Sequence, residues 1–367
     1  MGEKAMETVS QGKWSRLRSL ADADGRFKIM AIDQRGSLVD ALAKATGRLP
    51  EKVTGQELAR VKEMITRILA PYATAVLTDP IYGYPHSFQS IPQGVGLLLA
   101  CEESGYEKAG PERNERKSRL IEGWSVEQAQ TAAADAVKLL IYYHPDASAE
   151  VRRHQQGIVR RVGAECRRAN LPFLLELVSY DLSGNSTNSD DFARQKPDLV
   201  IRSAQEFSDP GYGVDVLKLE FPADLKRTEE FSGGAFDGQP RQAAYSVADV
   251  RDFCSQLNEA ARLPWVILSA GVGIEEFLVQ VELAVEAGAS GFLCGRAIWK
   301  DAISLYPDAP AMEDPALATR PPDNTESRPA DAHTLSRHRS RAGSTGRRHA
   351  EKMLAGGRRL AMDTTAQ

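Results

Sequence analysis

Eight short apolar runs, separated by longer segments with helical periodicity, constrain the fold of this 367-residue chain more than any other feature. Each run is bounded by turn residues or charged residues. Continuous apolar runs, unlike alternating ones, are typical of parallel strands that are covered on both faces. The predicted strands are Lys28–Arg35, Tyr72–Pro80, Val95–Glu102, Ala136–His144, Pro172–Tyr180, Asp215–Pro222, Trp265–Gly271 and Gly291–Ala297.

The segments between these runs carry helical patterns, for example GQELARVKEMITRILAPYA and SVADVRDFCSQLNEAARLP. Strands that alternate with helices indicate βαβ units and a parallel sheet. Eight such units predict one α/β domain, a TIM (β/α)₈ barrel over residues 1–305. A doubly wound open sheet is the structural alternative. It is disfavoured because no GxGxxG or GxxxxGK[ST] motif follows an early strand.

Residues 306–367 have a different character, with little apolar periodicity. Residues 332–359 hold eight Lys or Arg against one acidic residue, which is typical of a solvated, disordered chain. A contact with RNA is the alternative, but this stretch has no aromatic side chain on which a base could stack. We therefore predict a poorly structured Pro/Arg-rich tail that stays outside the core.

Composition and net charge limit which binding partners and which cellular compartment are plausible for the chain. The net charge of −4 provides no field that would draw the chain to nucleic acid or to an anionic membrane. No stretch reaches the roughly 18 apolar residues of a membrane span, and no signal-peptide pattern opens the sequence. The four cysteines are far apart and form no CxxC pair, which favours reduced thiols. We expect a cytoplasmic protein with neither a nucleic-acid nor a membrane partner.

Polar residues near the ends of the apolar runs are the candidates for chemistry, because TIM barrels carry their reactive groups at the carboxyl ends of strands. Burying an unpaired charge is costly, so these groups must pair with one another or with a ligand. If the first strand continues to residue 35, Asp33 and Arg35 share a face and Gln34 points the other way. The candidates are Asp33, Gln34, Arg35, Lys138, Glu176, Lys218, Glu220 and Ser269.

Lys138 and Lys218, each within an apolar run, are the most informative of these residues. Schiff-base chemistry needs one neutral amine near pH 7, and both burial and a second cation lower the pKa of a lysine. Alternatively, both lysines simply neutralise buried carboxylates such as Glu176 and Asp33. Glu176, midway through an apolar run, suits a general acid and base with a raised pKa. Glu220, two residues after Lys218, is expected to hold that lysine in position.

The last two predicted strands end in the pattern of a phosphate site, LSAGVG and CGRA. Backbone NH groups near Gly271, Gly273 and Gly295 can approach phosphate oxygens, while Ser269 donates a hydrogen bond and Arg296 supplies charge. Phosphate sites of TIM barrels commonly follow strands seven and eight. No histidine or cysteine spacing is typical of a metal site, so we expect no metal and no cofactor.

A set of colinear motifs between Trp14 and Ser304 resembles the class I tagatose-bisphosphate aldolases, with a further likeness of the last two strands to sulfofructose-phosphate aldolases. The motifs are AIDQRG, LTDPIYGYP, LLLACEESGY, DAVKLLIYYHPD, PFLLELVSYD, FSDPGYGVDVLKLEFP, LPWVILSAGV and GASGFLCGRAIWKDA. The chain departs from the family at its C-terminus, where the Pro/Arg-rich tail replaces a further helical region.

The resemblance implies roles for these residues. Lys218 forms the Schiff base, Lys138 is an auxiliary lysine, and Glu176 shuttles protons. Asp33, a further catalytic candidate, and Gln34 lie near the substrate hydroxyls. The residues that hold the dihydroxyacetone phosphate end are Ser269, Gly271, Gly295 and Arg296, and we expect Arg35 and Glu220 to contribute to substrate binding as well.

The predicted activity is cleavage of D-tagatose 1,6-bisphosphate, a phosphorylated ketose, to dihydroxyacetone phosphate and glyceraldehyde 3-phosphate in a homo-oligomer. One alternative is an aldolase for 6-deoxy-6-sulfofructose 1-phosphate, which would need cations for the distal sulfonate. An alternative of another class is a non-catalytic barrel that binds a sugar phosphate and regulates a partner.

Overall fold

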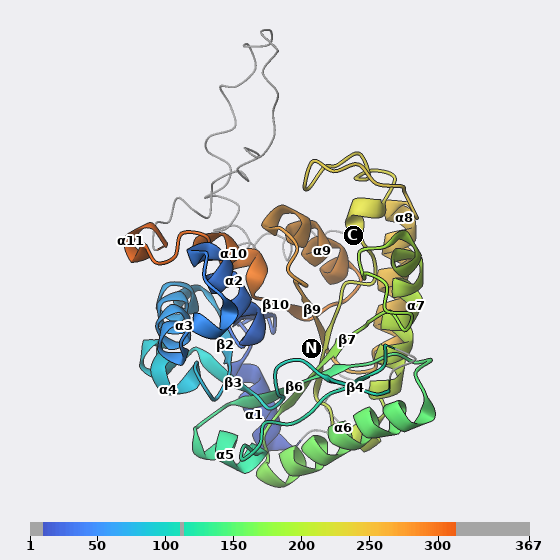
Figure 1. Cartoon of the computed structure of the whole chain (residues 1–367). Coiled ribbons are helices and arrows are strands. Elements are labelled where there is room, and N and C mark those ends of the chain that lie inside the picture. The colour runs from blue at the N-terminus through green and yellow to red at the C-terminus, as the bar shows by residue number, and fades with distance from the viewer. Residues whose placement is uncertain (1–9, 111–113, 313–367) are drawn as a thin grey trace, which may run out of the picture.

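A closed barrel of eight parallel strands forms the centre of the molecule (Figure 1). The computed structural model describes residues 10–110 and 114–312. The barrel strands are hydrogen-bonded in the circular order β1, β2, β3, β6, β7, β8, β9, β10. Their bounds are β1 Phe27–Ala31, β2 Ala75–Thr78, β3 Gly96–Ala100, β6 Ala136–Tyr142, β7 Phe173–Val178, β8 Val216–Leu219, β9 Trp265–Leu268 and β10 Gly291–Cys294. The predicted TIM barrel is confirmed, and the open-sheet alternative is wrong.

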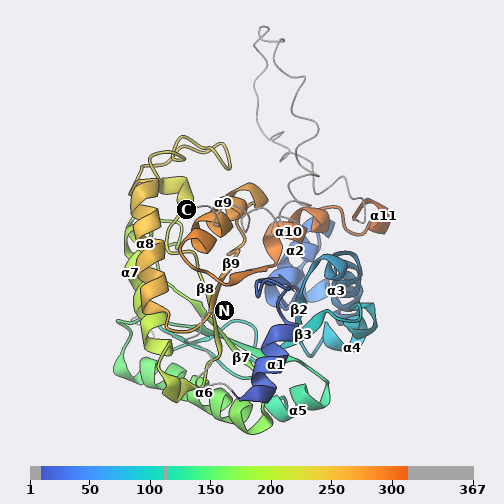
Figure 2. The same ribbon diagram turned by 180° about the vertical axis from the view of Figure 1, so that it is seen from behind.

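Helices surround the barrel and connect its strands. Figures 1 and 2 show α2, α3 and α4 on one side, α7 and α8 side by side on the other, and α6 beneath them. The α-helices are α1 Gln11–Ser19, α2 Gly36–Thr46, α3 Gly55–Leu69, α4 Tyr84–Ser87, α5 Val126–Thr131, α6 Ala149–Ala169, α7 Asp190–Phe207, α8 Val247–Ala260, α9 Ile274–Glu286, α10 Arg296–Ile303 and α11 Ala309–Met312. Within the described part of the chain, no helix has the length and apolarity needed to cross a membrane.

Shorter elements occupy the connections. The segment between β3 and α5 contains a two-stranded antiparallel sheet of β4 Glu107–Lys108 and β5 Arg116–Lys117. The 3₁₀ helices are η2 Pro50–Lys52, η3 Ala70–Tyr72, η4 Phe88–Ser90, η5 Pro210–Tyr212 and η6 Leu225–Arg227.

Local sequence signals explain where several helices begin and end. Thr54 and Glu57 form a capping box at the start of α3, in which each side chain accepts from the backbone NH of the other residue. Ser148 caps the start of α6, and Asn170 ends that helix in the left-handed conformation that asparagine tolerates.

Alternate residues of the strands point into the barrel, and their lower layers are apolar. Ala136, Leu174 and Val216 belong to this interior cluster, together with Leu17 of α1 and Leu20, which follows that helix. Helix α1 therefore closes the amino-terminal end of the barrel. The next inward positions along the same strands are 138, 176 and 218, so the charged residues lie above an apolar floor.

The strands end earlier than the sequence pattern predicts. Strand β1 ends at Ala31, so Asp33, Gln34 and Arg35 lie in the loop before α2 rather than on the strand. Strand alternation therefore does not decide which way these three side chains point, because the strand does not continue to residue 35 as the pairing of Asp33 with Arg35 on one face requires. Arg296 likewise begins α10 instead of ending the eighth strand.

The described structure continues a few residues past the domain boundary that we expect at residue 305. The Tyr306 hydroxyl bonds to Glu57 Oε1 at 3.0 Å, and Met312 is buried against the outer core on the α2 and α3 side. Residues 313–367, which include most of the predicted tail and its basic stretch, lie outside the described residues.

Candidate active site

A buried lysine surrounded by carboxylates forms the centre of the site. Lys138 Nζ lies 2.7 Å from Asp33 Oδ2, 2.7 Å from Glu102 Oε1 and 2.7 Å from Glu176 Oε2. Lys218 Nζ lies 2.9 Å from the same Glu176 oxygen. The structure thus brings together both lysines and two of the three carboxylates that the sequence singled out, Asp33 and Glu176.

The register of the barrel explains why Glu176 reaches Lys218. Glu176 of β7 and Lys218 of β8 are direct neighbours across the strand pair. Side chains of paired residues on adjacent strands point to the same face and lie close together. The contact between this carboxylate and this amine is therefore set by the backbone of two buried strands, which holds both groups in a fixed position.

The charges of the cluster determine its protonation. Burial alone would lower the pKa of Lys138, but Asp33, Glu102 and Glu176 outweigh burial and raise it well above the usual lysine value. Burial also acts to raise the pKa values of Asp33 and Glu176, yet the attraction of the lysines prevails and lowers both. The raised pKa that we expect for Glu176 from the sequence is therefore wrong. The resting cluster therefore holds a Lys138 ammonium between ionised carboxylates.

Glu102 is a member of the cluster that the sequence analysis did not select. It lies two residues after the end of β3 and contacts Lys138 through Oε1, while its Oε2 accepts from the backbone NH of Leu140 at 3.0 Å. Burial raises the pKa of Glu102 against the attraction of Lys138. The available signal was its position two residues after Ala100, on the inward face at the end of a predicted strand.

The loop that carries Asp33 is anchored by a second buried lysine, which sequence reasoning also missed. Lys62 of α3 donates to the carbonyl oxygens of Ile32 and Gln34, the latter at 2.7 Å. Its amine pairs with Asp79 Oδ2 at 2.9 Å, and both side chains are fully buried. Lys62 therefore holds the backbone in place by hydrogen bonds on both sides of Asp33.

Arg35 and Gln34 complete this loop. The Arg35 guanidinium is buried and donates to the carbonyl oxygen of Glu102, which ties the loop after β1 to the end of β3. The Gln34 side-chain oxygen is buried without a hydrogen-bond partner among the described residues. Both side chains line the central cavity.

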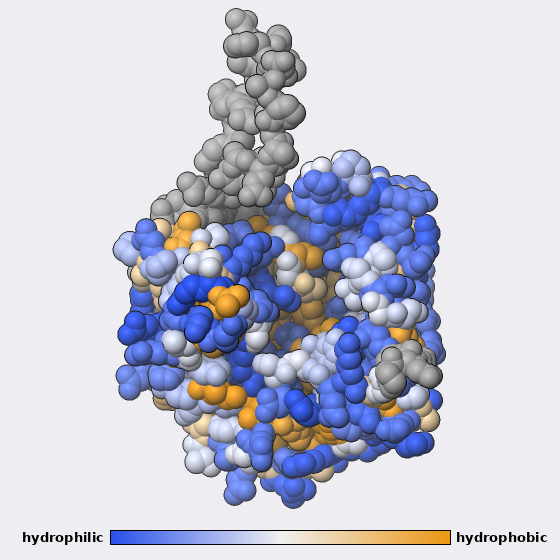
Figure 3. Space-filling model, in the orientation of Figure 1, coloured by the Kyte–Doolittle hydropathy of each residue, from blue (hydrophilic) through white to orange (hydrophobic). Residues whose placement is uncertain are grey.

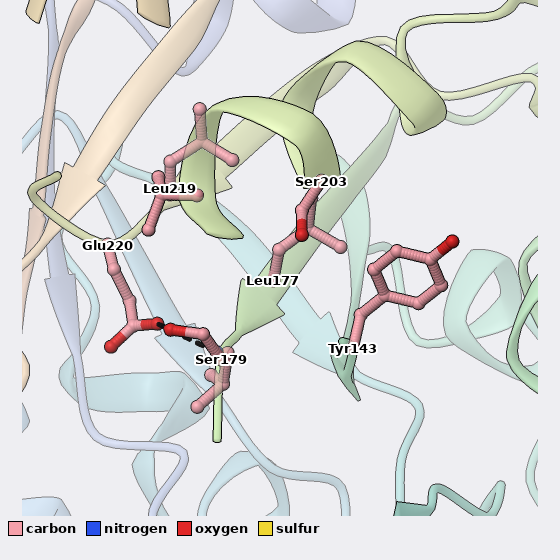
Figure 4. A pocket seen from close by; sticks show the side chains of 8 residues that line it. Tyr143, Leu177, Ser179, Ser203, Leu219 and Glu220 are labelled. Atoms are coloured by element: carbon pink, nitrogen blue, oxygen red, sulfur yellow. Dashed lines mark hydrogen bonds between the residues drawn. The ribbon is translucent and has the colours of Figure 1, made fainter. Parts of the chain in front are cut away.

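Glu220 has a different role from the expected one. Its Oε2 accepts hydrogen bonds from the backbone NH of Ser179, at 2.7 Å, and from the Ser179 hydroxyl, as Figure 4 shows. The carboxylate that forms an ion pair with Lys218 is instead that of Glu176. Glu220 thus joins the ends of β7 and β8 and still lines the cavity.

The predicted phosphate-binding residues gather at the ends of β9 and β10. Ser269 is buried directly after β9, and Gly271 has a φ of +81°, which favours glycine. A Cβ on Gly271 would lie 3.2 Å from the Arg296 guanidinium carbon, so arginine and turn are in close contact. Gly295 precedes α10, whose first turn has neither a side-chain cap nor an acidic residue. Free NH groups and a positive helix end suit an anion here.

One cavity of about 660 Å³ extends from the carboxylates around Lys138 to Arg296. Its lining includes Asp33, Lys138 and Glu176 at the floor and Arg296 at the phosphate end. Figure 3 shows a hollow near the centre of the face, between the region of α2 and α10 and that of α7 and α8, with a largely hydrophilic surround. A site of this size accommodates a ligand as large as a sugar phosphate.

The described residues contain no group of three or more His, Cys, Asp or Glu arranged to hold a metal ion. Their arrangement is instead a set of carboxylates around two amines, joined to an anion-binding end. Such a site can bind a phosphorylated carbonyl compound and move protons beside it.

Comparison with protein families identifies the chain. The family model described as DeoC/LacD family aldolase matches residues 27–301, which span all eight barrel strands. This chain belongs to the DeoC/LacD aldolase family. It is therefore an aldolase, a carbon–carbon lyase, and the alternative of a non-catalytic regulatory barrel is not supported.

Two relatives of this aldolase are similar over most of their length. Tagatose 1,6-diphosphate aldolase 2 of Enterococcus faecalis is 37% identical over 306 residues, covering 83% of this chain and 88% of that protein. Tagatose 1,6-diphosphate aldolase of Listeria monocytogenes is 36% identical over 303 residues, covering 82% and 85%. The resemblance inferred from the motifs is confirmed.

Solved structures show the same fold at much lower identity. A Schiff-base-forming fructose-1,6-bisphosphate aldolase matches with a TM-score of 0.50 and 18% identity, covering 82% of this chain and 96% of the other. A fructose-bisphosphate aldolase from Slackia heliotrinireducens matches with a TM-score of 0.53 and 15% identity, covering 83% and 87%. At this identity the likeness supports the barrel architecture of the aldolase.

Proposed function

We propose that this aldolase is a class I enzyme that cleaves D-tagatose 1,6-bisphosphate through a Schiff base on Lys218. The observation that carries the proposal is the unequal surroundings of the two lysines. Lys138 contacts three carboxylates, whereas Lys218, among residues 10–110 and 114–312, forms an ion pair with Glu176 alone.

This asymmetry supports different roles for the two amines, with Lys138 as a charged ammonium and Lys218 as the nucleophile. A protonated amine is not a nucleophile, and the carboxylates that raise the pKa of Lys138 keep that residue charged. Lys218, beside the Lys138 ammonium, is the amine that attacks. Its nitrogen adds to the ketose carbonyl carbon, water leaves, and a protonated imine results.

The protonated imine then accepts electrons from the sugar. The bond between C3 and C4 breaks, its electron pair passes into an enamine, and the C4 hydroxyl loses its proton as the aldehyde leaves. Asp33, ionised and next to Lys138, or a substrate phosphate takes that proton. Protonation of the enamine carbon and addition of water release dihydroxyacetone phosphate and restore Lys218.

Glu176 serves the proton transfers that this sequence requires. Its Oε2 lies within hydrogen-bond distance of both amines, at 2.9 Å from Lys218 and 2.7 Å from Lys138. Its lowered pKa supplies an ionised carboxylate that can accept a proton from the attacking amine and return it when the carbinolamine loses water. Because the contact is made before substrate binds, no rearrangement of β7 or β8 is needed.

The phosphate on C1 would bind at the end of the cavity that Arg296 lines, with Ser269, Gly271 and Gly295 as its further contacts. The uncapped start of α10 supports this placement, since its NH groups and dipole favour an anion. The tagatose 1,6-diphosphate aldolases that share 36–37% identity with this chain support the choice of substrate.

A steady-state assay with purified protein tests this function. We expect D-tagatose 1,6-bisphosphate to yield both triose phosphates and the Lys218→Met variant to yield neither. D-fructose 1,6-bisphosphate and 6-deoxy-6-sulfofructose 1-phosphate are the comparison substrates. If the wild-type enzyme preferred 6-deoxy-6-sulfofructose 1-phosphate, that sugar would be the substrate in place of D-tagatose 1,6-bisphosphate. Full activity in Lys218→Met would exclude the Schiff base on this residue.

We also propose that the enzyme acts in the cytoplasm as a homo-oligomer. All four cysteines are unpaired and buried, as suits a reducing compartment. Sedimentation velocity tests the assembly, and a monomer at micromolar concentration would contradict that part of the proposal.

A further inference from the structure

A further cation, Arg116, lies in the cavity at a distance from the lysine pair. The Arg116 guanidinium lies over three tyrosine rings, 4.4 Å from the centre of Tyr106, 5.3 Å from Tyr142 and 4.8 Å from Tyr180. Arg116 begins the short strand β5, in the segment that connects β3 to α5. It also lines the cavity that contains Lys138 and Glu176.

Within the described part of the chain, the NH groups of this guanidinium are left without a carboxylate partner. Arg116 Nε is buried without a hydrogen-bond partner, and no carboxylate within residues 10–110 and 114–312 forms an ion pair with Arg116. Aromatic rings contact a guanidinium through its face, whereas its NH groups point outward along its edge. The three rings fix the cation and leave an edge of donors for a ligand.

The position of Arg116 relative to the reacting centre follows from strand geometry. Lys138 and Tyr142 share the inward face of β6, since alternate residues of a strand point to one side. Tyr142 is the last residue of β6 and lies nearer the mouth. Arg116, stacked on Tyr142, is therefore on the same wall as Lys138 but farther toward the opening.

The other cations of the lining have different surroundings. Lys226 pairs with Glu276 at 3.2 Å, and Arg35 donates to the Glu102 carbonyl oxygen. Arg296 belongs to the opposite, C1-phosphate end. Lys196 of α7, like Arg116, forms no ion pair within the described residues. Unlike Arg116, however, its amine is not held by an aromatic ring among them. Arg116 is thus the preorganised cation of the mouth.

We propose that Arg116 is a specificity-determining residue that binds the distal anionic group of the substrate, the phosphate or sulfonate on C6 of a ketose 1-phosphate. This inference rests on the proposed function and extends it. A planar guanidinium can donate two parallel hydrogen bonds to such an oxyanion, and a fixed side chain loses little entropy on binding. Substrates that lack the distal anion would leave Arg116 unused.

The test compares substrates with and without the distal group. Wild type should prefer D-tagatose 1,6-bisphosphate to D-tagatose 1-phosphate. In Arg116→Met, kcat/KM for the bisphosphate should fall about 10- to 100-fold, the worth of charge-assisted hydrogen bonds, while that for the monophosphate stays unchanged. Arg116→Lys retains the positive charge but not the two parallel NH donors of the guanidinium. Its kcat/KM for the bisphosphate should therefore fall less than that of Arg116→Met. Parallel assays with 6-deoxy-6-sulfofructose 1-phosphate decide whether the bound group is phosphate or sulfonate.

Two control variants separate this role from a structural one. Arg119→Met removes an exposed cation from the same segment, and Lys196→Met removes another cation of the cavity lining. Neither should change the preference. An equal loss on both sugars in Arg116→Met and Arg116→Lys, no loss on either, or a selective loss in Lys196→Met would overturn the inference. If wild-type protein cleaves no ketose phosphate at all, the proposed function itself fails.

Discussion

Lys62 and Asp79 illustrate how much the position of one catalytic group depends on a pair outside the cavity floor. Their ion pair is fully buried, and Lys62 holds the carbonyl oxygens of Ile32 and Gln34. Burial lowers the pKa of Lys62 against the attraction of Asp79. The ammonium thus depends on its partner, and the loop that carries Asp33 depends on the ammonium.

Lys62→Met should destabilise the protein by about 3–5 kcal/mol, because it leaves the Asp79 carboxylate buried without its partner. Urea unfolding measures this loss. The double variant Lys62→Met/Asp79→Leu should recover part of it, since no charge then remains buried. A double variant that is less stable than Lys62→Met would contradict this account of the pair.

Asp33 gives the site a defined dependence on pH. Its pKa is lowered from the ordinary 3.8 by Lys138 and Lys218, despite burial, so ionised Asp33 stabilises the folded state. That contribution is present above pH 3.8 and is lost as pH falls through the folded value. The stability advantage of wild type over Asp33→Asn should therefore shrink below about pH 4.

Glu102 provides a control for this measurement, because its contribution to stability should change with pH in the opposite direction to that of Asp33. Its pKa is raised from the ordinary 4.5, chiefly by burial, so its contribution to stability decreases as pH rises through the folded value. The stability of wild type relative to Glu102→Gln should improve toward low pH. If both differences change in the same direction, the assigned charge states are incorrect.

At this scale, sequence patterns found the residues whose polarity interrupts an apolar run. Lys138, Glu176 and Lys218 stand out for that reason, and the structure brings them together. Glu102 and Lys62 were missed because neither interrupts a run: the first follows a strand, and the second is on an amphipathic helix where a lysine is expected at the surface. Only the tertiary fold shows that both are buried.

At the scale of elements, the approach of α6 to η5 is set by a single glycine. A Cβ on Gly163 would lie 1.8 Å from the backbone oxygen of Tyr212, a separation that backbone atoms cannot tolerate. Gly157, on the same helix, is exposed, and a Cβ there would meet nothing within 4 Å. One helix thus offers both a test position and its control.

Gly163→Ala should destabilise the protein by about 1–3 kcal/mol or more, the usual cost of overpacking. Gly157→Ala should stabilise it by about 0.5–1 kcal/mol, because alanine favours a helix interior more than glycine does. Thermal unfolding of the two variants measures both effects. A Gly163→Ala variant as stable as wild type would show that α6 can move away from η5 without cost.

Existence and order of the elements were predictable, but their ends were not. Continuous apolar runs identified all eight strands, because strands buried on both faces have few polar residues. The same runs continue into residues such as Asp33 and Ser269 that follow the strands, since the chain stays buried at the barrel mouth. Composition does not mark the point where the hydrogen-bond ladder stops.

At the scale of the whole molecule, the closed sheet brings groups from distant parts of the sequence to one cavity. The lysine and carboxylate cluster comes from β6, β7 and β8 and from the segments after β1 and β3, while the anion-binding end follows β9 and β10. Closure of the barrel places these two parts side by side. Membership in the DeoC/LacD aldolase family agrees with this arrangement.

Reductive trapping tests the central claim most directly. The protein is incubated with D-tagatose 1,6-bisphosphate or dihydroxyacetone phosphate, reduced with sodium borohydride, digested and analysed by mass spectrometry. We predict that the three-carbon phosphate adduct is on the peptide containing Lys218 and that Lys138 is unmodified. An adduct on Lys138, or none on any lysine while the enzyme turns over, would contradict the account.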